Sequence, residues 1–169
     1  MNKFDIRHMS RLSLLVSAGL IIFVLEGFIT LPIAIPGIKL GLSNIVTLFT
    51  LYAFSRRDAC LVLILRIVLG SLFGGQVVSF WYSLSGGVLC LLAMSLCKFV
   101  LNEEYMVVTS VVGAVFHNIG QLLAALVILE NTAIIYYLPA LLLGGVLCGI
   151  LTGLCCKLVF KRLKNVLKI

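Results

Sequence analysis

Three ionisable side chains, Glu26, Arg66 and His117, stand within long runs of apolar residues. In a helix surrounded by lipid such groups are rare, and each one indicates a functional site by default. Glu26 and Arg66 carry opposite charges, and helical rise places them at similar depths, about 9 and 12 Å below the ends of their runs at Pro32 and Gly74. The pair is either a structural bridge between two helices or part of a pocket, and these interpretations are compatible.

The run that contains His117 has the clearest pattern. Its small and polar residues recur every three or four positions, which places them on one helical face. They are Ser110, Gly113, His117, Gly120 or Gln121, and Ala124, with Asn118 beside them. Such a stripe is typical of close helix packing or of a cavity wall. Two amides and an imidazole within five residues favour the cavity wall, and the alternative is that His117 and Asn118 bond to neighbouring backbone.

The segment Gly37–Asn44 begins another apolar run directly after Pro36. The free N–H groups and positive end of a helix starting here favour an anion. Lys39 either supports that anion or extends its ammonium group to the membrane surface. Two further patterns of small residues mark close helix contacts, within the chain or with another subunit: Gly145, Gly149 and Gly153, and Ser13 with Ser17.

The elements that must position these residues are membrane-spanning helices. Of the 169 residues 62% are hydrophobic and 11% charged, whereas a soluble domain is about 25% charged. The apolar runs approach the length of roughly 20 residues that crosses a bilayer, which excludes a soluble enzyme and a disordered chain. We therefore expect an all-α polytopic membrane protein, a single-domain bundle of six transmembrane helices. The predicted spans cover residues 12–31, 41–54, 59–73, 79–100, 106–129 and 133–160.

The distribution of basic residues predicts the orientation. With six spans, eleven of the 13 Lys and Arg residues fall on the side that holds both termini, and cytoplasmic loops carry such an excess. Both termini are therefore expected in the cytoplasm. Trp81 and Tyr136 fall at the opposite interface, where amphipathic rings are common. The basic residues are scattered loop flanks, so no nucleic-acid partner is expected.

The sequence lacks the motifs of several chemistries. It has no Asp-rich cluster to hold Mg²⁺ and no phosphate-binding loop. Its six cysteines form no CxxC pair, and their spacing is unlike that of zinc sites. We therefore expect no enzymatic activity, no metal and no cofactor.

Motifs along the chain resemble the signature of one family. They are Leu31-Pro32…Pro36-Gly37-Ile38-Lys39-Leu40-Gly41-Leu42-Ser43-Asn44, Arg66…Leu69-Gly70-Ser71-Leu72…Gly75, Ser79-Phe80…Tyr82-Ser83-Leu84…Gly86-Gly87, His117-Asn118…Gly120-Gln121-Leu122 and Tyr136-Tyr137-Leu138-Pro139. The family is the Gx transporter group, often labelled heptaprenyl diphosphate synthase component I. It is similar to the substrate-binding S components of energy-coupling-factor (ECF) transporters, and the resemblance covers nearly all of the chain.

The resemblance implies a six-helix protein that captures a small vitamin-like or cofactor-precursor solute at the outer face of a bacterial plasma membrane. Such a component docks on a transmembrane coupling subunit and two cytoplasmic ATPases, often through small residues on its first helix, where this chain has Ser13 and Ser17. The label implies instead an accessory subunit of prenyl diphosphate or quinone synthesis. Some members sit beside flavin-binding proteins of extracellular electron transfer, which implies a third role.

We predict a substrate site in the outer half of the bundle. Arg66 and Lys39 would supply positive charge for an anionic group, His117 and the amides would orient polar atoms, and Trp81 or Tyr136 would stack on a ring. The candidate lid is the loop 32–39. The predicted site residues are Glu26, Lys39, Asn44, Arg66, Gln76, Trp81, His117, Asn118, Gln121 and Tyr136.

Overall fold

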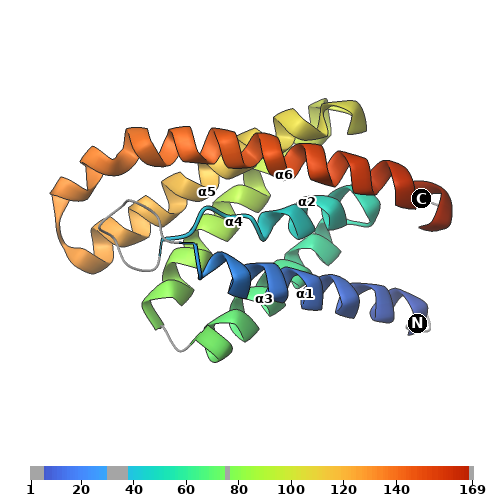
Figure 1. The fold of residues 1–169 in the computed structure, drawn as a ribbon, viewed down its shortest axis with the longest axis horizontal. Helices are drawn as coiled ribbons and strands as arrows, with labels where there is room; N and C mark the ends of the chain where they lie inside the picture. The colour runs from blue at the N-terminus through green and yellow to red at the C-terminus, as the bar shows by residue number, and fades with distance from the viewer. Residues whose placement is uncertain (1–5, 30–37, 75–76, 168–169) are drawn as a thin grey trace.

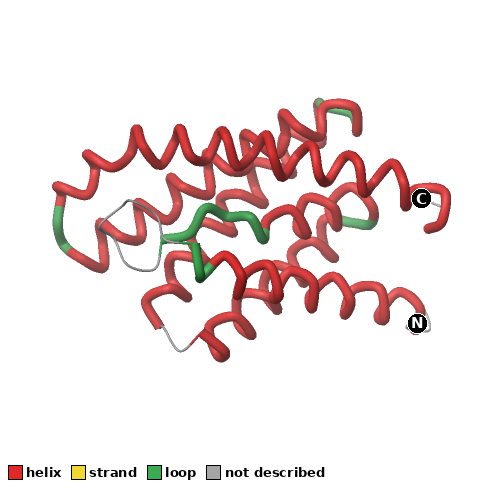
Figure 2. Tube along the Cα trace, in the orientation of Figure 1, coloured by secondary structure: helices red, strands yellow, loops and turns green. Residues whose placement is uncertain are grey.

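The computed structural model describes residues 6–29, 38–74 and 77–167, and in these ranges the chain forms helices and no strands (Figure 2). The all-α prediction is therefore confirmed. The helices are α1 (Ile6–Glu26), α2 (Asn44–Ala53), α3 (Arg56–Gly74), α4 (Val77–Val100), the 3₁₀ helix η1 (Glu103–Tyr105), α5 (Met106–Leu129), the 3₁₀ helix η2 (Thr132–Tyr137) and α6 (Leu138–Leu167).

Four helical stretches are long and apolar enough to cross a membrane. They are α1, α4, α5 together with η1, and α6 together with η2. Helix α2 is apolar but has only 10 residues, and α3 has 19 residues that include two arginines and an aspartate in its first turn and Arg66 farther along. The structure thus supports a helical membrane protein, and four of the six predicted spans meet the requirements of a full span.

Helix α2 lies at the centre of the bundle (Figure 1). Eight of its ten residues are buried, and it contacts α1, α3, α4, α5 and α6. Its length is about 15 Å, or half the thickness of a bilayer's hydrocarbon core. The sequence predicts that this element begins at residue 41, but residues 38–43 are not helical and α2 begins at Asn44. It is therefore a half-helix whose N-terminus lies inside the protein.

Helix α1 ends earlier than the sequence predicts. Its predicted range was 12–31, whereas the helix covers Ile6–Glu26. Beyond it, the N–H groups of Gly27, Phe28 and Ile29 donate to carbonyls three residues back, at 3.0–3.1 Å, which tightens the chain into a turn. Hydropathy does not locate this end because the apolar residues continue to position 31. Glu26 is consequently the last residue of α1 and not an interior residue of a helix that continues to residue 31.

The α6 glycines pack inside the molecule. A Cβ added at Gly149 would lie 2.7 Å from Cα of Val111, and one added at Gly153 would lie 2.8 Å from Cα of Val107. At these two positions there is room only for the hydrogen atom of a glycine side chain, so the backbones of α5 and α6 are in direct contact. Between the two alternatives for this ridge, the structure therefore selects internal packing.

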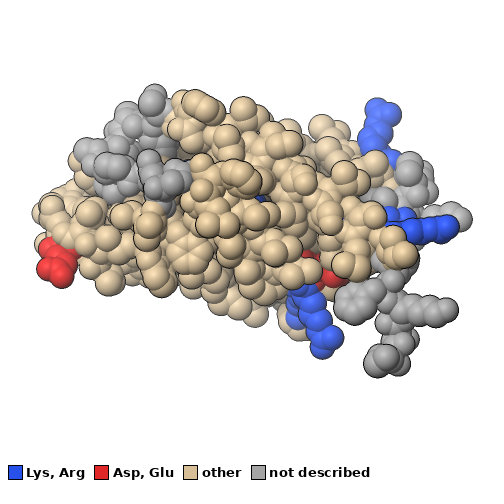
Figure 3. All heavy atoms as spheres, turned by 90° about the horizontal axis from the view of Figure 1, so that it is seen from below, with Lys and Arg blue, Asp and Glu red and all other residues tan. Residues whose placement is uncertain are grey.

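Helix α1 begins and α6 ends at the same end of the molecule (Figure 1). The exposed Lys and Arg side chains visible in Figure 3 lie in one half of the molecule, towards that end. We call it the basic end. It agrees with the predicted clustering of positive charge around both termini, which sets orientation in a membrane.

A capping box starts α3 at the basic end. The Ser55 hydroxyl accepts the N–H of Asp58 at 3.1 Å, and the Asp58 carboxylate accepts the N–H of Ser55 at 3.2 Å, a reciprocal pattern typical of helix N-termini. His8 of α1 contacts the other carboxylate oxygen at 3.0 Å. Partial burial raises the pKa of Asp58, but the hydrogen bonds from Ser55 and His8 outweigh it, so the pKa lies below its ordinary value of 3.8.

Candidate functional site

The Glu26 carboxylate occupies the N-terminal end of α2. It accepts the backbone N–H of Gly41, that of Leu42 at 3.2 Å and that of Ser43 at 3.5 Å. Free N–H groups and the helix dipole make such a position favourable for an anion. Glu26 of the same chain therefore lies where the sequence predicts an anion, bonded to the N–H groups of the turn that precedes α2.

Arg66 extends from α3 to the same turn of chain. Its Nη1 donates to the Ser43 hydroxyl and its Nη2 to the side-chain amide oxygen of Asn44 at 3.2 Å. Among the described residues the ion pairs are His8–Asp58 and Lys164–Glu103, so Glu26 and Arg66 form no direct pair. Both side chains are at most 3% exposed, and they are linked through Ser43. The sequence analysis offered two interpretations of this pair, a structural bridge between two helices and part of a pocket. The structure contains no direct salt bridge between the two side chains.

The polar stripe of α5 has two parts with different surroundings. In the half nearer the basic end, Ser110 bonds to Thr152 of α6 at 3.0 Å, and a Cβ on Gly113 would lie 2.6 Å from Met94. That half serves helix packing. In the other half His117, Asn118 and Gln121 are buried. The Asn118 amide nitrogen donates to the Leu141 backbone carbonyl at 2.5 Å, as the alternative of bonding to backbone predicts for this residue, and other polar atoms of this half are unpaired.

Seven buried side-chain atoms in this region have no hydrogen-bond partner. They are Asn44 Nδ2, Thr47 Oγ1, Arg66 Nε, His117 Nδ1, Asn118 Oδ1 and both Nε2 and Oε1 of Gln121. Leaving such a group unpaired costs about 1–3 kcal/mol by protein mutational data. Since buried polar groups are normally satisfied, each unpaired one calls for an explanation such as water, strain or a functional partner. They come from α2, α3 and α5, and their gathering in one region points to a shared partner.

We call these residues, together with Glu26 and Ser43, the polar cluster. Its members come from the end of α1, the start of α2, the middle of α3 and the middle of α5. The full set is Glu26, Ser43, Asn44, Thr47, Arg66, His117, Asn118 and Gln121, and every member is at most 7% exposed.

Glycines bring the backbone against the polar cluster. Gly41 has a φ of 83°, and a Cβ there would lie 2.8 Å from both Asn44 Nδ2 and His117 Cδ2. On the other side of the imidazole, a Cβ on Gly86 would lie 2.8 Å from His117 Nδ1. A Cβ on Gly145 would lie 2.5 Å from the Asn118 amide nitrogen. Residues 38–43 thus cover the polar cluster closely in this structure.

The remaining predicted site residues lie elsewhere. Lys39 is half-buried beside the polar cluster, where its Nζ donates to the Phe23 carbonyl at 3.3 Å. The structure does not bury Trp81 or Tyr136 with the cluster, because they are 53% and 87% exposed. The stacking predicted for these two rings is therefore not supported by their positions. Gln76 lies outside the described residues, as does most of the predicted lid 32–39.

The sequence did not identify two members of the polar cluster, Ser43 and Thr47, as site residues. Ser43 joins Glu26 to Arg66, and Thr47 lies one helical turn beyond it on α2, at 1% exposure. Hydroxyl groups are common in membrane helices, where they bond to their own backbone, so they carry a weak signal. Their spacing of four residues beside Asn44 was the pattern that could have identified them.

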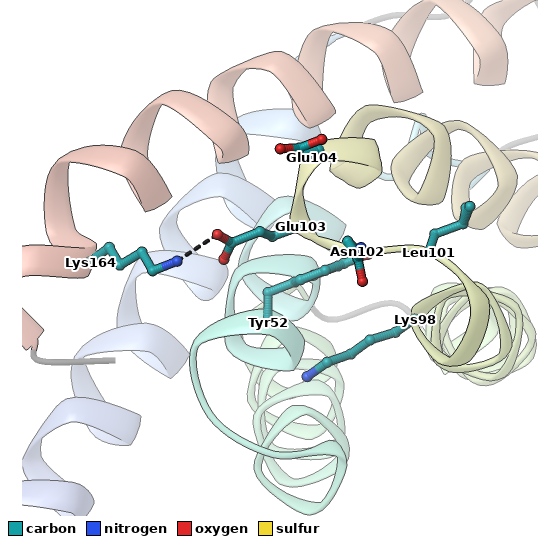
Figure 4. Close-up of a pocket in the computed structure, with 7 residues that line it drawn as sticks. All are labelled: Tyr52, Lys98, Leu101, Asn102, Glu103, Glu104 and Lys164. Carbon is teal, nitrogen blue, oxygen red and sulfur yellow. Dashed lines mark hydrogen bonds and ion pairs between the residues drawn. The ribbon is translucent and has the colours of Figure 1, made fainter.

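A surface pocket of about 570 Å³ lies at the opposite end of α2, at the basic end of the molecule (Figure 4). Lys164 and Glu103 face each other across it as an ion pair at 2.5 Å, and Lys98 donates to the Leu51 carbonyl near the end of α2. None of its lining residues has a buried unpaired side-chain atom. The polar cluster is therefore the stronger candidate site. The pocket is lined by Tyr52, Lys98, Leu101, Asn102, Glu103, Glu104 and Lys164.

The predicted partner-docking residues of α1 remain exposed. Ser13 and Ser17 each donate to the carbonyl four residues earlier, both at 3.0 Å. Their hydroxyls are thereby satisfied within α1, and this face of the helix presents a surface of low polarity. Docking of a partner on it stays a prediction.

Comparison with known proteins identifies the family of the chain. Neither a curated protein nor a solved structure matches it. A family model described as heptaprenyl diphosphate synthase component I matches residues 15–159, which include all described helices at least in part and every member of the polar cluster. The chain belongs to the heptaprenyl diphosphate synthase component I family.

Proposed function

We propose that the chain is the substrate-binding membrane component of an ECF-type importer, which captures a small vitamin-like or cofactor-precursor solute at the polar cluster. The observation that carries this proposal is the set of seven unpaired polar atoms in a protein interior. A half-helix whose N-terminus meets these atoms adds support, because discontinuous membrane helices often form the binding sites of transporters.

The proposed orientation of the molecule determines the side of the membrane from which a solute reaches the polar cluster. With the basic end in the cytoplasm, the polar cluster lies from the middle of the membrane outwards, since His117 is at the centre of α5 (Met106–Leu129). Residues 38–43 then cover the cluster from the outer side. Because the Gly41 backbone lies against His117 and Asn44, a solute enters when this segment moves away from α5.

Glu26 controls that segment in our proposal. Its carboxylate ties the backbone of residues 41–43 to the end of α1. Movement of the segment breaks these hydrogen bonds, and contacts of the solute with the unpaired atoms replace them. The contacts of the solute thereby offset part of the cost of breaking these hydrogen bonds.

The energy for uptake comes from other subunits, because the sequence has no phosphate-binding loop. We infer a transmembrane coupling subunit and two cytoplasmic ATPases as partners. The α1 face with Ser13 and Ser17 is available for docking, since both residues are exposed and small side chains allow helices to approach closely.

The description of the family favours a second function, that of an accessory membrane subunit in prenyl diphosphate or quinone synthesis. In that case a soluble, Asp-rich synthase would dock at the basic end. A related alternative is an accessory membrane subunit of a flavin-based extracellular electron-transfer system.

Purification from native membranes in mild detergent separates these functions. The importer predicts co-purification of a membrane coupling subunit with two ATPases and ATP-dependent uptake of a solute by vesicles that contain all four chains. A soluble Asp-rich synthase in place of the ATPases would contradict the importer and support the second function. A flavoprotein without any transported solute would instead support the electron-transfer role.

A further inference from the structure

The charged groups of the polar cluster are already compensated by the protein itself. Glu26 accepts three consecutive backbone N–H groups, those of residues 41–43. Arg66 gives both terminal nitrogens to the side chains of Ser43 and Asn44. Glu26 and Arg66 also carry opposite charges and are both buried, so a partner that enters the cluster meets no large net charge from this pair.

The third charge nearby, Lys39, is also engaged. Its Nζ donates to the Phe23 carbonyl at 3.3 Å and lies 3.1 Å from the centre of the Phe23 ring. A cation over an aromatic face is stabilised by the ring's negative surface. Lys39 is thus held against α1 rather than directed at the unpaired atoms.

The unpaired atoms belong mainly to groups without a full charge. Six of the seven are on amide, hydroxyl or imidazole groups, and the exception is Arg66 Nε. They include donors, such as Asn44 Nδ2, and acceptors, such as Asn118 Oδ1. A ligand that satisfies them must itself carry both donors and acceptors.

Gln121 makes this requirement specific. It is fully buried, and both its amide nitrogen and its amide oxygen are unpaired. The complement of a free amide is another group with a donor next to an acceptor, such as an amide, a lactam or an imide. A carboxylate or phosphate has acceptors only, so it would leave Gln121 Oε1 and Asn118 Oδ1 unpaired. It would also be repelled by Glu26, which already occupies the anion site of α2.

We propose that the polar cluster recognises an uncharged amide- or imide-bearing solute through Gln121, Asn118 and Asn44, and that Glu26 excludes carboxylates and phosphates from this position. The proposal rests on the importer function and specifies its substrate class. It differs from the expectation from sequence, in which Arg66 and Lys39 bind an anionic group, because Arg66 Nη1 and Nη2 and Lys39 Nζ donate to protein oxygens and Arg66 Nε alone stays unpaired.

The test is extraction of co-purified small molecules from the full chain, isolated from membranes in mild detergent and analysed by mass spectrometry. Gln121→Leu removes both amide atoms at nearly constant size. Leu123→Ala is the matched control, because Leu123 is on the same helix and 50% exposed on the outer surface. We expect a compound with an amide or imide group, uncharged at neutral pH, that is at least tenfold enriched in wild type and Leu123→Ala over Gln121→Leu.

Three results would overturn the proposal. An enriched compound with a carboxylate or phosphate at neutral pH refutes the substrate class and leaves the importer function intact. Equal amounts in wild type and Gln121→Leu refute the role of Gln121. The absence of any enriched compound in the wild-type chain contradicts both this proposal and the importer, and indicates that water satisfies the cluster. If Gln121→Leu does not fold, Gln121→Met replaces it, and the same loss is expected because a thioether has no donor.

Discussion

The carboxylate of Glu26, the last residue of α1, accepts the backbone N–H of Gly41, whose φ is 83°. This bond joins two elements separated by fifteen residues and fixes the segment that covers the polar cluster. It also fills the N-terminal end of α2 with a charge from the same chain. The predictions below follow from this relationship and from the packing around it.

Substitution of Glu26 tests the hydrogen bonds to residues 41–43. Glu26→Gln removes the negative charge and one acceptor oxygen while preserving size, so we expect a loss of about 1–3 kcal/mol in unfolding free energy. Thermal unfolding in detergent measures it. Glu130→Gln is the control, since Glu130 is exposed and its substitution should leave the melting temperature unchanged. Equal effects of the two variants would show that Glu26 does not hold the segment.

Gly41→Ala tests the covering of the polar cluster. A Cβ at this positive φ is strained, and it would lie 2.8 Å from Asn44 Nδ2 and His117 Cδ2. We expect a destabilisation of roughly 1–3 kcal/mol. Gly144→Ala provides the comparison, because its Cβ would meet only Leu40 at 3.8 Å and alanine favours a helix interior by about 1 kcal/mol. Gly144→Ala should therefore be neutral or stabilising in the same assay.

The interface of α5 with α6 is tested by Gly149→Ala. The new methyl group would lie 2.7 Å from Cα of Val111, and backbone yields less easily than a side-chain tip. Overpacking of this kind typically costs about 1–3 kcal/mol. The expected melting temperature is below that of Gly144→Ala, which adds the same methyl group to the same helix. A melting temperature equal to that of Gly144→Ala would mean that α5 and α6 do not pack as described.

The contact between α1 and α3 predicts a pH dependence. The pKa of Asp58 is lower in the folded chain than its ordinary value of 3.8, so the ionised form favours the folded state. This contribution is complete above the ordinary pKa and is lost as the pH falls through the lower folded value. Asp58→Asn should thus be less stable than wild type at pH 7, and the difference should shrink below about pH 4. A difference that stays constant from pH 7 to pH 3 would contradict the assignment.

The sequence is sufficient for the helical architecture and for part of the site. The stripe on α5 identifies His117, Asn118 and Gln121 because helical periodicity is a local property. The apolar runs likewise locate most helices, although the end of α1 at Glu26 was missed because the turn at Gly27 lies within an apolar run.

The partner of Glu26 could not be predicted from sequence. Composition suggests Arg66 as its counter-charge, whereas the structure pairs Glu26 with backbone N–H groups of residues 41–43. That pairing depends on where α2 begins, and the start at Asn44 depends in turn on packing against five other helices. A local sequence pattern does not encode such long-range contacts. The start of α2 and the position of Glu26 beside it could therefore be found only from the three-dimensional structure.

The central claim is that the unpaired atoms of the polar cluster bind a solute. An experimental density map of the full chain in lipid nanodiscs, at a resolution that shows ordered water, tests it most directly. We predict connected, non-protein density larger than a water molecule within about 3 Å of Gln121 Nε2 and Asn118 Oδ1, the range of a hydrogen bond. Isolated water peaks at these atoms, or a Gln121 side chain paired with protein groups, would contradict the claim.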